Sequence, residues 1–92
     1  MTQHGLDENF TIAARDVTKL AIMPTNQEKL ILYANYKQAI YGDATGNRPS
    51  IFSPEARAKW DGWQQLCGTS QNQAKANYIA MYNSLVVKYG HQ

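Results

Sequence analysis

The sequence predicts an all-α protein, and we expect one small bundle of four helices. Apolar residues recur every three or four positions along most of the chain, a spacing that places their side chains on one face of a helix. Proline, serine, threonine and glycine stand where these stretches begin or end. No stretch shows the alternation of apolar and polar residues that is typical of a half-buried strand. At 92 residues the chain has the length of one domain with one modest core.

The first predicted helix follows a loose tail over residues 1–6. Asp7 is a suitable N-cap, and Glu8 lies in the first turn, where the helix dipole favours an acidic side chain. Pro24 ends the helix because proline has no N–H to donate. Since the next helix follows after a short turn, we expect the two helices to be antiparallel. The apolar stripe of the first helix consists of Phe10, Ala13, Ala14, Val17, Leu20 and Ala21.

The second predicted helix, over residues 24–42, is the one around which we expect the others to pack. Thr25 and Glu28 form a capping box, which satisfies N–H groups at the start of a helix, and Gly42 suits the positive φ angle at its end. The helix is apolar on nearly all sides, so its neighbours must cover it. Its apolar residues are Leu30, Ile31, Leu32, Ala34, Ala39 and Ile40.

An irregular stretch, residues 42–52, precedes the third predicted helix and is rich in turn-forming residues. Arg48 in this stretch is a lone cation, for which we expect a structural role, such as capping a helix, ahead of contact with a ligand. Ser53 is the predicted N-cap of the third helix, Pro54 its first residue and Gly68 its end. The stripe of this helix consists of Ala56, Trp60, Trp63 and Cys67.

The fourth predicted helix begins with a second capping box, formed by Ser70 and Gln73. Lys88 suits its last turn, and Gly90 ends it. Its apolar stripe consists of Ala74, Tyr78, Met81, Tyr82, Leu85 and Tyr89.

Composition and charge exclude several classes of protein. The formal net charge is +2, from nine cations and seven anions with no run of cations, which argues against a nucleic-acid-binding protein. No stretch approaches the roughly 20 apolar residues of a membrane span, and the start of the chain has no signal-peptide pattern. The single cysteine, Cys67, allows no internal disulfide and fits a reducing compartment such as the cytoplasm.

The residues that carry catalysis or bind metals are also missing. The two histidines, His4 and His91, lie near the ends of the chain, far in sequence from Cys67, and the sequence shows no clustered carboxylates. No Ser/His/Asp or Cys/His set, no spacing of metal ligands and no phosphate-binding glycine loop is present. The pattern therefore favours binding over catalysis, without a cofactor or a metal.

Two tyrosines and a lysine interrupt the apolar pattern of the second helix. Tyr33 and Lys37 are four residues apart and share a face, and Tyr36 lies one position round from Lys37. Such a set can hold a phosphorylated aromatic ligand, because lysine pairs with phosphate and tyrosine stacks on a purine. Lys59 and Tyr78 can join it if the helices bring them together. The alternative is that these side chains bury their stems and keep their polar tips in water.

Four segments together resemble the acyl-CoA-binding protein family: LYANYKQAIYGD, RP, ARAKWDGW and GTS, followed by YI. The similarity extends from Phe10 to Gly90. It implies a four-helix bundle of up-down-down-up topology and a single acyl-CoA-binding domain over residues 1–92. It also implies that the protein binds long-chain fatty acyl-CoA and acts as an intracellular carrier and pool former. The expected partner is acyl-CoA alone, delivered by a monomer to acyl-CoA-using enzymes or membranes without stable insertion.

The resemblance also implies roles for individual residues at the head group of the ligand. Tyr33 and Lys37 correspond to residues that meet the phosphates. Tyr36 corresponds to the residue that stacks on adenine. Lys59 corresponds to the partner of the 3′-phosphate region, and Tyr78 to a further head-group contact.

Ala14 and Leu30 correspond to the groove wall near the pantetheine and the acyl chain. Two positions depart from the pattern of the family. Thr18 stands where many members have a lysine that helps to hold the ligand, a loss for which Lys19 can compensate. Lys29 stands where members often have an apolar residue lining the acyl groove. Both departures bear on affinity and on the preferred chain length.

Two other functions are compatible with the sequence. The first is a helical protein-interaction module of the same fold, whose tyrosine and lysine face docks a protein partner and whose ligand binding is lost or weakened. The second is a detached piece of an enzyme, since such domains can be fused to domains that process acyl-CoA, although the chain offers no catalytic partner. The interaction module predicts no gain in melting temperature with acyl-CoA, whereas acyl-CoA binding predicts a gain.

Overall fold

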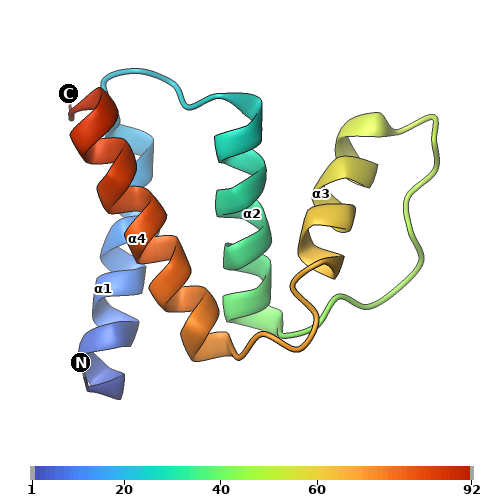
Figure 1. The fold of residues 1–92 in the computed structure, drawn as a ribbon, viewed down its shortest axis with the longest axis horizontal. Helices are drawn as coiled ribbons and strands as arrows, with labels where there is room; N and C mark the ends of the chain where they lie inside the picture. The colour runs from blue at the N-terminus through green and yellow to red at the C-terminus, as the bar shows by residue number, and fades with distance from the viewer. Residues whose placement is uncertain (1, 92) are drawn as a thin grey trace.

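The structure is a computed structural model, and it describes residues 2–91. Its helices are α1 (Gln3–Asp16), the short 3₁₀ helix η1 (Val17–Lys19), α2 (Asn26–Tyr41), α3 (Pro54–Gln64) and α4 (Gln71–Tyr89). Within the described residues the only β pairing is a single bridge between Leu20 and His91. Figure 1 shows α1 and α4 running in one direction and α2 and α3 in the other. The predicted all-α, up-down-down-up bundle is confirmed.

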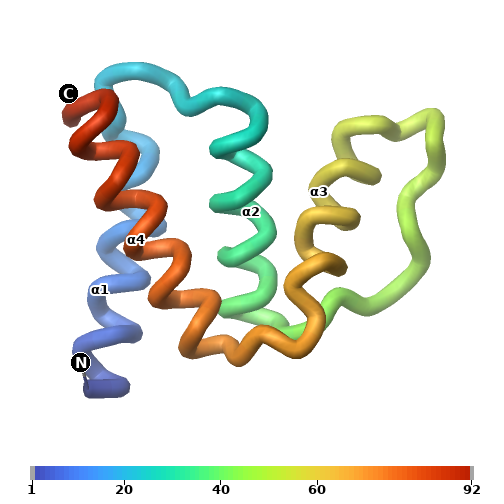
Figure 2. Tube along the Cα trace, in the orientation of Figure 1, coloured from blue at the N-terminus to red at the C-terminus, as the bar shows by residue number. Residues whose placement is uncertain are grey.

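The helices differ in how much of the bundle they contact. α4 packs against both α1 and α2, whereas the main partner of α3 is α2. Figure 2 shows α3 on the side of α2 that faces away from α1, with the connection between α2 and α3 bowing outward. α1 and α2 are antiparallel, as expected, although the packing between them goes mainly through α4.

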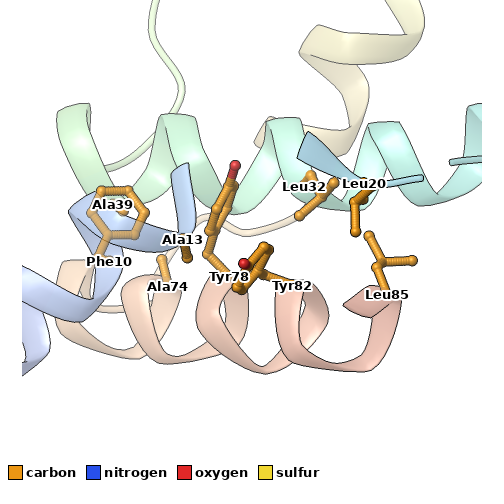
Figure 3. Close-up of a cluster of buried hydrophobic side chains, with 9 residues drawn as sticks. All are labelled: Phe10, Ala13, Leu20, Leu32, Ala39, Ala74, Tyr78, Tyr82 and Leu85. Carbon is orange, nitrogen blue, oxygen red and sulfur yellow. The ribbon is translucent and has the colours of Figure 1, made fainter. Parts of the chain in front are cut away.

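The hydrophobic core lies between α1, α2 and α4 (Figure 3). α3 contributes no residue to it. Trp63 is the one buried residue of α3, and it closes the space between α3 and the end of α2. The core consists of Phe10, Ala13, Leu20, Leu32, Ala39, Ala74, Tyr78, Tyr82 and Leu85.

The helix starts agree with the sequence to different degrees. The capping box of α2 is confirmed: Thr25 Oγ1 accepts the Glu28 N–H at 3.2 Å, and Glu28 Oε1 accepts the Thr25 N–H at 2.8 Å. In α4, Ser70 Oγ accepts the Gln73 N–H at 3.0 Å, but the Gln73 carboxamide donates within α4. Ser53 stands at the N-cap position of α3 without a side-chain capping bond.

The loose tail predicted before Asp7 is wrong for its described residues, because α1 begins at Gln3. Thr2 is the N-cap, and its Oγ1 accepts the Gly5 N–H at 3.1 Å. Asp7 lies inside the helix, where its carboxylate accepts hydrogen bonds from the Gln3 amide and, at 2.6 Å, from the Lys75 ammonium. These contacts hold the first turn against α4. The first residue of the predicted tail lies outside the described part of the chain.

The first helix also ends earlier than the sequence predicts, at Asp16 and not at Pro24. After η1 the backbone of Leu20 is extended, and the Ala21 N–H donates to the Gly90 carbonyl at 2.8 Å. A contact with the far end of the chain therefore takes these residues out of the helix. Ala21, expected in the apolar stripe, is exposed.

In α3 the predicted apolar stripe is not the buried face of the helix, and the helix ends at Gln64, before the predicted end at Gly68. Ala56 and Cys67 are exposed. The face that meets α2 contains Gly62, where an added Cβ would lie 3.6 Å from the Ala34 Cβ. Because α3 approaches α2 through this glycine, the stripe of larger residues lies to one side of the contact.

α2 is less completely covered than its composition suggests. Ile31 is 38% exposed and Ile40 is 43% exposed, because α3 and α4 pack against only part of its surface. Two polar residues on the covered side, Asn35 and Gln38, are buried instead. The Gln38 carboxamide donates to Asp43 and to the Thr69 carbonyl, each at 2.8 Å, and so fixes the end of α2 to the start of α4.

Candidate functional site

A groove lies between α2, α3 and the loop that precedes α3. It comprises two cavities of about 750 and 690 Å³, each of a size that suits a small-molecule ligand. The two cavities adjoin, because both are lined by Tyr33, Pro54, Glu55 and Lys59.

The first cavity is rich in aromatic rings and carries two ammonium groups. Lys37 Nζ lies 5.0 Å from the centre of the Trp63 ring and 5.9 Å from that of Tyr33. Lys59 Nζ approaches the Tyr33 ring from α3, at 5.4 Å, and pairs with Glu55 at 3.3 Å. Within residues 2–91 Lys37 has no ion-pair partner (ion pairs join Lys19, Lys59, Lys75 and Lys88 to acids). This end of the groove is therefore suited to an anionic group with an aromatic part.

The wall of this cavity is held by hydrogen bonds between α3 and the loop. The Trp63 indole N–H donates to the Gly42 carbonyl at 2.7 Å, and the Trp60 indole N–H donates to the Thr45 carbonyl at 3.2 Å. Arg48 forms a two-pronged ion pair with Asp61, at 2.7 and 2.8 Å. Arg48 thus has a structural role, as expected, although it pairs with a carboxylate and caps no helix.

The second cavity continues along α2 toward its start. Leu30 of α2 faces Pro54 and Ala58 of α3 across it. Asn26 and Lys29, from the first turn of α2, line its far end. The groove therefore has a cationic and aromatic end, an apolar middle and a polar far end.

Tyr36 and Tyr78 form a separate cluster with Phe10. The Tyr36 ring stacks near that of Phe10 with centres 5.8 Å apart, and Tyr78 meets Phe10 edge-on at 5.3 Å. Tyr36 is 40% exposed, so part of its ring is free to stack on a ligand. Tyr78 is buried, and burial, followed by the nearby Tyr36, raises its pKa to about 12. Its phenol therefore stays neutral and keeps its O–H donor.

The structure thus divides the seven residues predicted for the site. Tyr33, Lys37, Lys59 and Leu30 line the groove. Tyr36 and Tyr78 lie together on the side of α2 that meets α1 and α4. Ala14 is half-buried against the core and is not among the residues that line the groove.

The two departures from the family pattern lie in different places. The Thr18 hydroxyl donates to the Arg15 carbonyl at 2.8 Å, and Lys19 pairs with Asp16 at 3.4 Å. Neither Thr18 nor Lys19 lines the groove. Lys29 does line it, at the far end.

Sequence reasoning missed part of the lining. It assigned Trp60 and Trp63 to a core stripe, yet both line the first cavity. The spacing of Lys59 and Trp63, four residues apart on a helix, is the signal that could have placed them on the face of the lysine. Pro49 and Pro54 also contribute lining, and no local pattern pointed to them.

Comparison with known proteins decides the family. The family model described as "Acyl CoA binding protein" matches residues 7–82, most of the chain. The protein belongs to the acyl-CoA-binding protein family. The match spans all the residues that line the groove between α2 and α3.

Relatives and solved structures of acyl-CoA-binding proteins agree with this assignment. The chain is 44% identical over 82 residues to the acyl-CoA-binding protein of Brassica napus, with 89% of each chain covered. It is 42% identical over 80 residues to that of Saccharomyces cerevisiae, covering 87% of this chain and 92% of the relative. The crystal structure of Oryza sativa acyl-CoA-binding protein 2 matches with a TM-score of 0.88 and 39% identity, covering 92% of both chains.

Among residues 2–91, no helix has the length and the apolar character needed to cross a membrane. The same residues contain no group of three or more His, Cys, Asp and Glu side chains placed to hold a metal ion.

Proposed function

We propose that this protein binds long-chain fatty acyl-CoA esters in the groove between α2 and α3 and serves as an intracellular acyl-CoA carrier. The observation that carries the proposal is Lys37, which lacks an ion-pair partner within residues 2–91 and stands among aromatic rings where an apolar groove begins. Acyl-CoA offers the complementary groups, because it joins phosphates and an adenine to a thioester and an acyl chain.

The head group is held by charge and by aromatic surface. Lys37 binds phosphate directly, and a charge-assisted hydrogen bond of this kind is roughly twice as strong as a neutral one. Lys59 exchanges its exposed partner Glu55 for phosphate, at little cost because such surface pairs are weak. The Tyr33 hydroxyl donates a hydrogen bond to the phosphates, and the exposed part of the Tyr36 ring stacks on adenine. The buried Tyr78 ring, whose centre lies 6.1 Å from that of Tyr36, supports the Tyr36 ring from the side of the core.

The acyl chain follows the apolar middle of the groove, where Leu30 and Ala58 face each other. Burial contributes about 0.8 kcal/mol per CH₂ group, so longer chains bind more tightly until the groove is filled. Ala14 on α1 borders the ligand on the side of Tyr36. The protein shields the thioester and the chain from water and needs no catalytic group, as expected of a monomeric carrier that keeps a pool of acyl-CoA for enzymes or membranes.

The direct test is calorimetric titration with palmitoyl-CoA, run beside free CoA and free palmitate. We expect one-to-one binding of the ester and much weaker binding of each fragment, because the groove contacts the head group and the chain together. Binding of palmitate alone with the affinity of the ester would contradict the head-group site. No heat and no gain in melting temperature with the ester would favour a protein-interaction module instead.

The site assignment is tested by two substitutions and a control. Lys37→Ala should weaken palmitoyl-CoA binding by about 1.5–3 kcal/mol, the range for hydrogen bonds to charged groups, and Tyr33→Phe by about 1 kcal/mol. Lys75→Ala removes a lysine that pairs with Asp7 outside the groove and should leave the affinity unchanged. Circular dichroism should show the same helix content in all three variants. Unchanged affinity in both Lys37→Ala and Tyr33→Phe would remove these residues from the site.

A further inference from the structure

The far end of the groove carries a second lysine without an ion-pair partner. Of the six lysines, four pair with an acid, and within residues 2–91 only Lys29 and Lys37 do not. Both line the groove, Lys37 in the first cavity and Lys29 in the second. They are eight positions apart, which corresponds to about 12 Å along α2. The groove therefore has an available cation at each end, separated by apolar surface.

This distribution of charge is unsuited to a plain acyl chain. If the CoA phosphates bind at Lys37, as proposed above, the chain runs past Leu30 and its end reaches the surroundings of Lys29. A terminal methyl group there gains little, because packing it against an ammonium removes water from a charge without replacing the lost hydrogen bonds. A terminal carboxylate instead pairs with Lys29 and accepts a hydrogen bond from the Asn26 amide.

Glu55, the acidic residue in the lining of this cavity, is engaged elsewhere. Its carboxylate lies 3.3 Å from Lys59 Nζ, and it forms no ion pair with Lys29. The Lys29 charge is thus not neutralised from α3. We propose that the groove selects acyl-CoA esters whose chain ends in a carboxylate, the mono-CoA thioesters of long-chain dicarboxylic acids. This inference rests on the proposed function and concerns the distal end of the same site.

The test compares two ligands that differ only at the chain end, palmitoyl-CoA and hexadecanedioyl mono-CoA. Their dissociation constants are measured by calorimetry for the wild type, for Lys29→Met and for Lys19→Met. Lys29→Met replaces the ammonium by an apolar group of similar length, and Lys29→Gln serves as a second variant that removes the charge but keeps a polar side chain. Lys19→Met removes another exposed charge, one that does not line the groove.

We expect Lys29→Met to shift the ratio of the two dissociation constants by about tenfold in favour of palmitoyl-CoA, from a lost ion pair and a gained apolar contact. Lys29→Gln should shift it in the same direction by a smaller factor, and Lys19→Met should not shift it. In the wild type the advantage of the dicarboxylic ester should appear only above the chain length that reaches Lys29, and high salt should reduce it.

The outcomes separate this inference from the proposed function. If the wild type binds palmitoyl-CoA but Lys29→Met leaves the ratio unchanged, the selection for a carboxylate is wrong and the carrier function stands. An equal shift in Lys19→Met also overturns the selection, because the effect then comes from net charge. If the wild type binds neither ester, the proposed function fails, and the inference fails with it.

Discussion

At the scale of single residues, Glu28 shows how one side chain serves two purposes. Its carboxylate closes the capping box of α2 and also accepts hydrogen bonds from Lys88, at 2.9 Å, and from the Tyr89 hydroxyl, at 2.7 Å. The start of α2, which carries Lys29 and Asn26, is thereby tied to the end of α4. The hydrogen bond from Lys88, followed by that from the Thr25 backbone, lowers the pKa of Glu28 from 4.5 to about 2.

This pKa gives a prediction about stability and pH. Because the pKa of Glu28 is lower in the folded state than in the unfolded state, the ionised carboxylate stabilises the fold above pH 4.5, and this contribution is lost as the pH falls toward 2. Glu28→Gln should therefore lower the melting temperature at neutral pH, and its difference from the wild type should shrink as the pH falls through 4.5 toward 2.

The measurement is thermal unfolding followed by circular dichroism across this pH range. Glu8→Gln is the matched control, because Glu8 is an exposed carboxylate of α1 whose one ion pair is with His4 at 3.8 Å. It should change the melting temperature little. A difference between Glu28→Gln and the wild type that stays constant with pH would show that the ion pair with Lys88 does not contribute.

The roles of many single residues can be predicted from the sequence, and the other roles depend on contacts with residues far away in the chain. The four-residue spacing of Tyr33 and Lys37 placed them on one side of α2, and both line the groove. The position of Lys59 opposite Tyr33 depends on how α3 packs against α2, which no spacing within one helix determines. The second role of Glu28 depends on residues about sixty positions away, so the sequence showed only its capping bond.

At the scale of the helices, α2 and α3 differ in how their N-termini are capped. Thr25 and Ser53 look alike in sequence, each a hydroxyl residue before a helix, but only Thr25 makes a side-chain capping bond. Thr25→Ala should therefore lower the free energy of unfolding by about 1 kcal/mol, the usual cost of a lost N-cap. Ser53→Ala should change it by much less, because it removes no such bond.

Urea denaturation of the two variants, with the slope of the free energy against urea held in common, measures this difference. Equal losses in both variants would mean that the Ser53 hydroxyl forms a capping bond in solution. Either variant should keep the wild-type slope, since neither changes the surface exposed on unfolding.

The helix boundaries show where local patterns stop being sufficient. Thr25 and Gly42 frame α2 as predicted, and Gly42 has a φ angle of +79°, because these signals act within one turn. The end of α1 is set by the hydrogen bond between Ala21 and Gly90, from opposite ends of the chain. The Asp7 carboxylate is likewise used by Lys75 of α4. A boundary set by a distant contact leaves no mark in the neighbouring sequence.

At the scale of the whole molecule, the groove exists because α3 is peripheral. The core is formed by α1, α2 and α4, and α3 meets this assembly mainly through α2. Its contacts with the preceding loop include two indole hydrogen bonds, a hydrogen bond from Arg57 to the Pro49 carbonyl and the ion pair of Arg48 with Asp61. Elements with few buried apolar contacts open at lower free energy than the core helices. α3 is thus the helix best able to move when a ligand enters.

This arrangement predicts a specific pattern of amide hydrogen exchange. Without ligand, the amides of α3 should exchange faster than those in the middle of α2 and α4, because α3 can open without disrupting the core. A ligand that binds in the groove stabilises only closed states, so palmitoyl-CoA should slow exchange in α3 and in the loop before it. The amides of α1 that lie away from the groove serve as the internal control and should change least.

The pattern distinguishes a groove ligand from general stabilisation of the fold. Slowing confined to α3, the loop and the facing turns of α2 requires that the ligand bridge the two helices, as Tyr33 and Lys59 are placed to do. If palmitoyl-CoA slowed the first turns of α1, away from Ala14, as much as α3, the ligand would be acting on global unfolding. If it slowed α1 and left α3 unchanged, binding would lie on the other side of α2, beside Tyr36 and Tyr78. The four predicted site residues that line the groove, Tyr33, Lys37, Lys59 and Leu30, would then act only in the structure of the free protein.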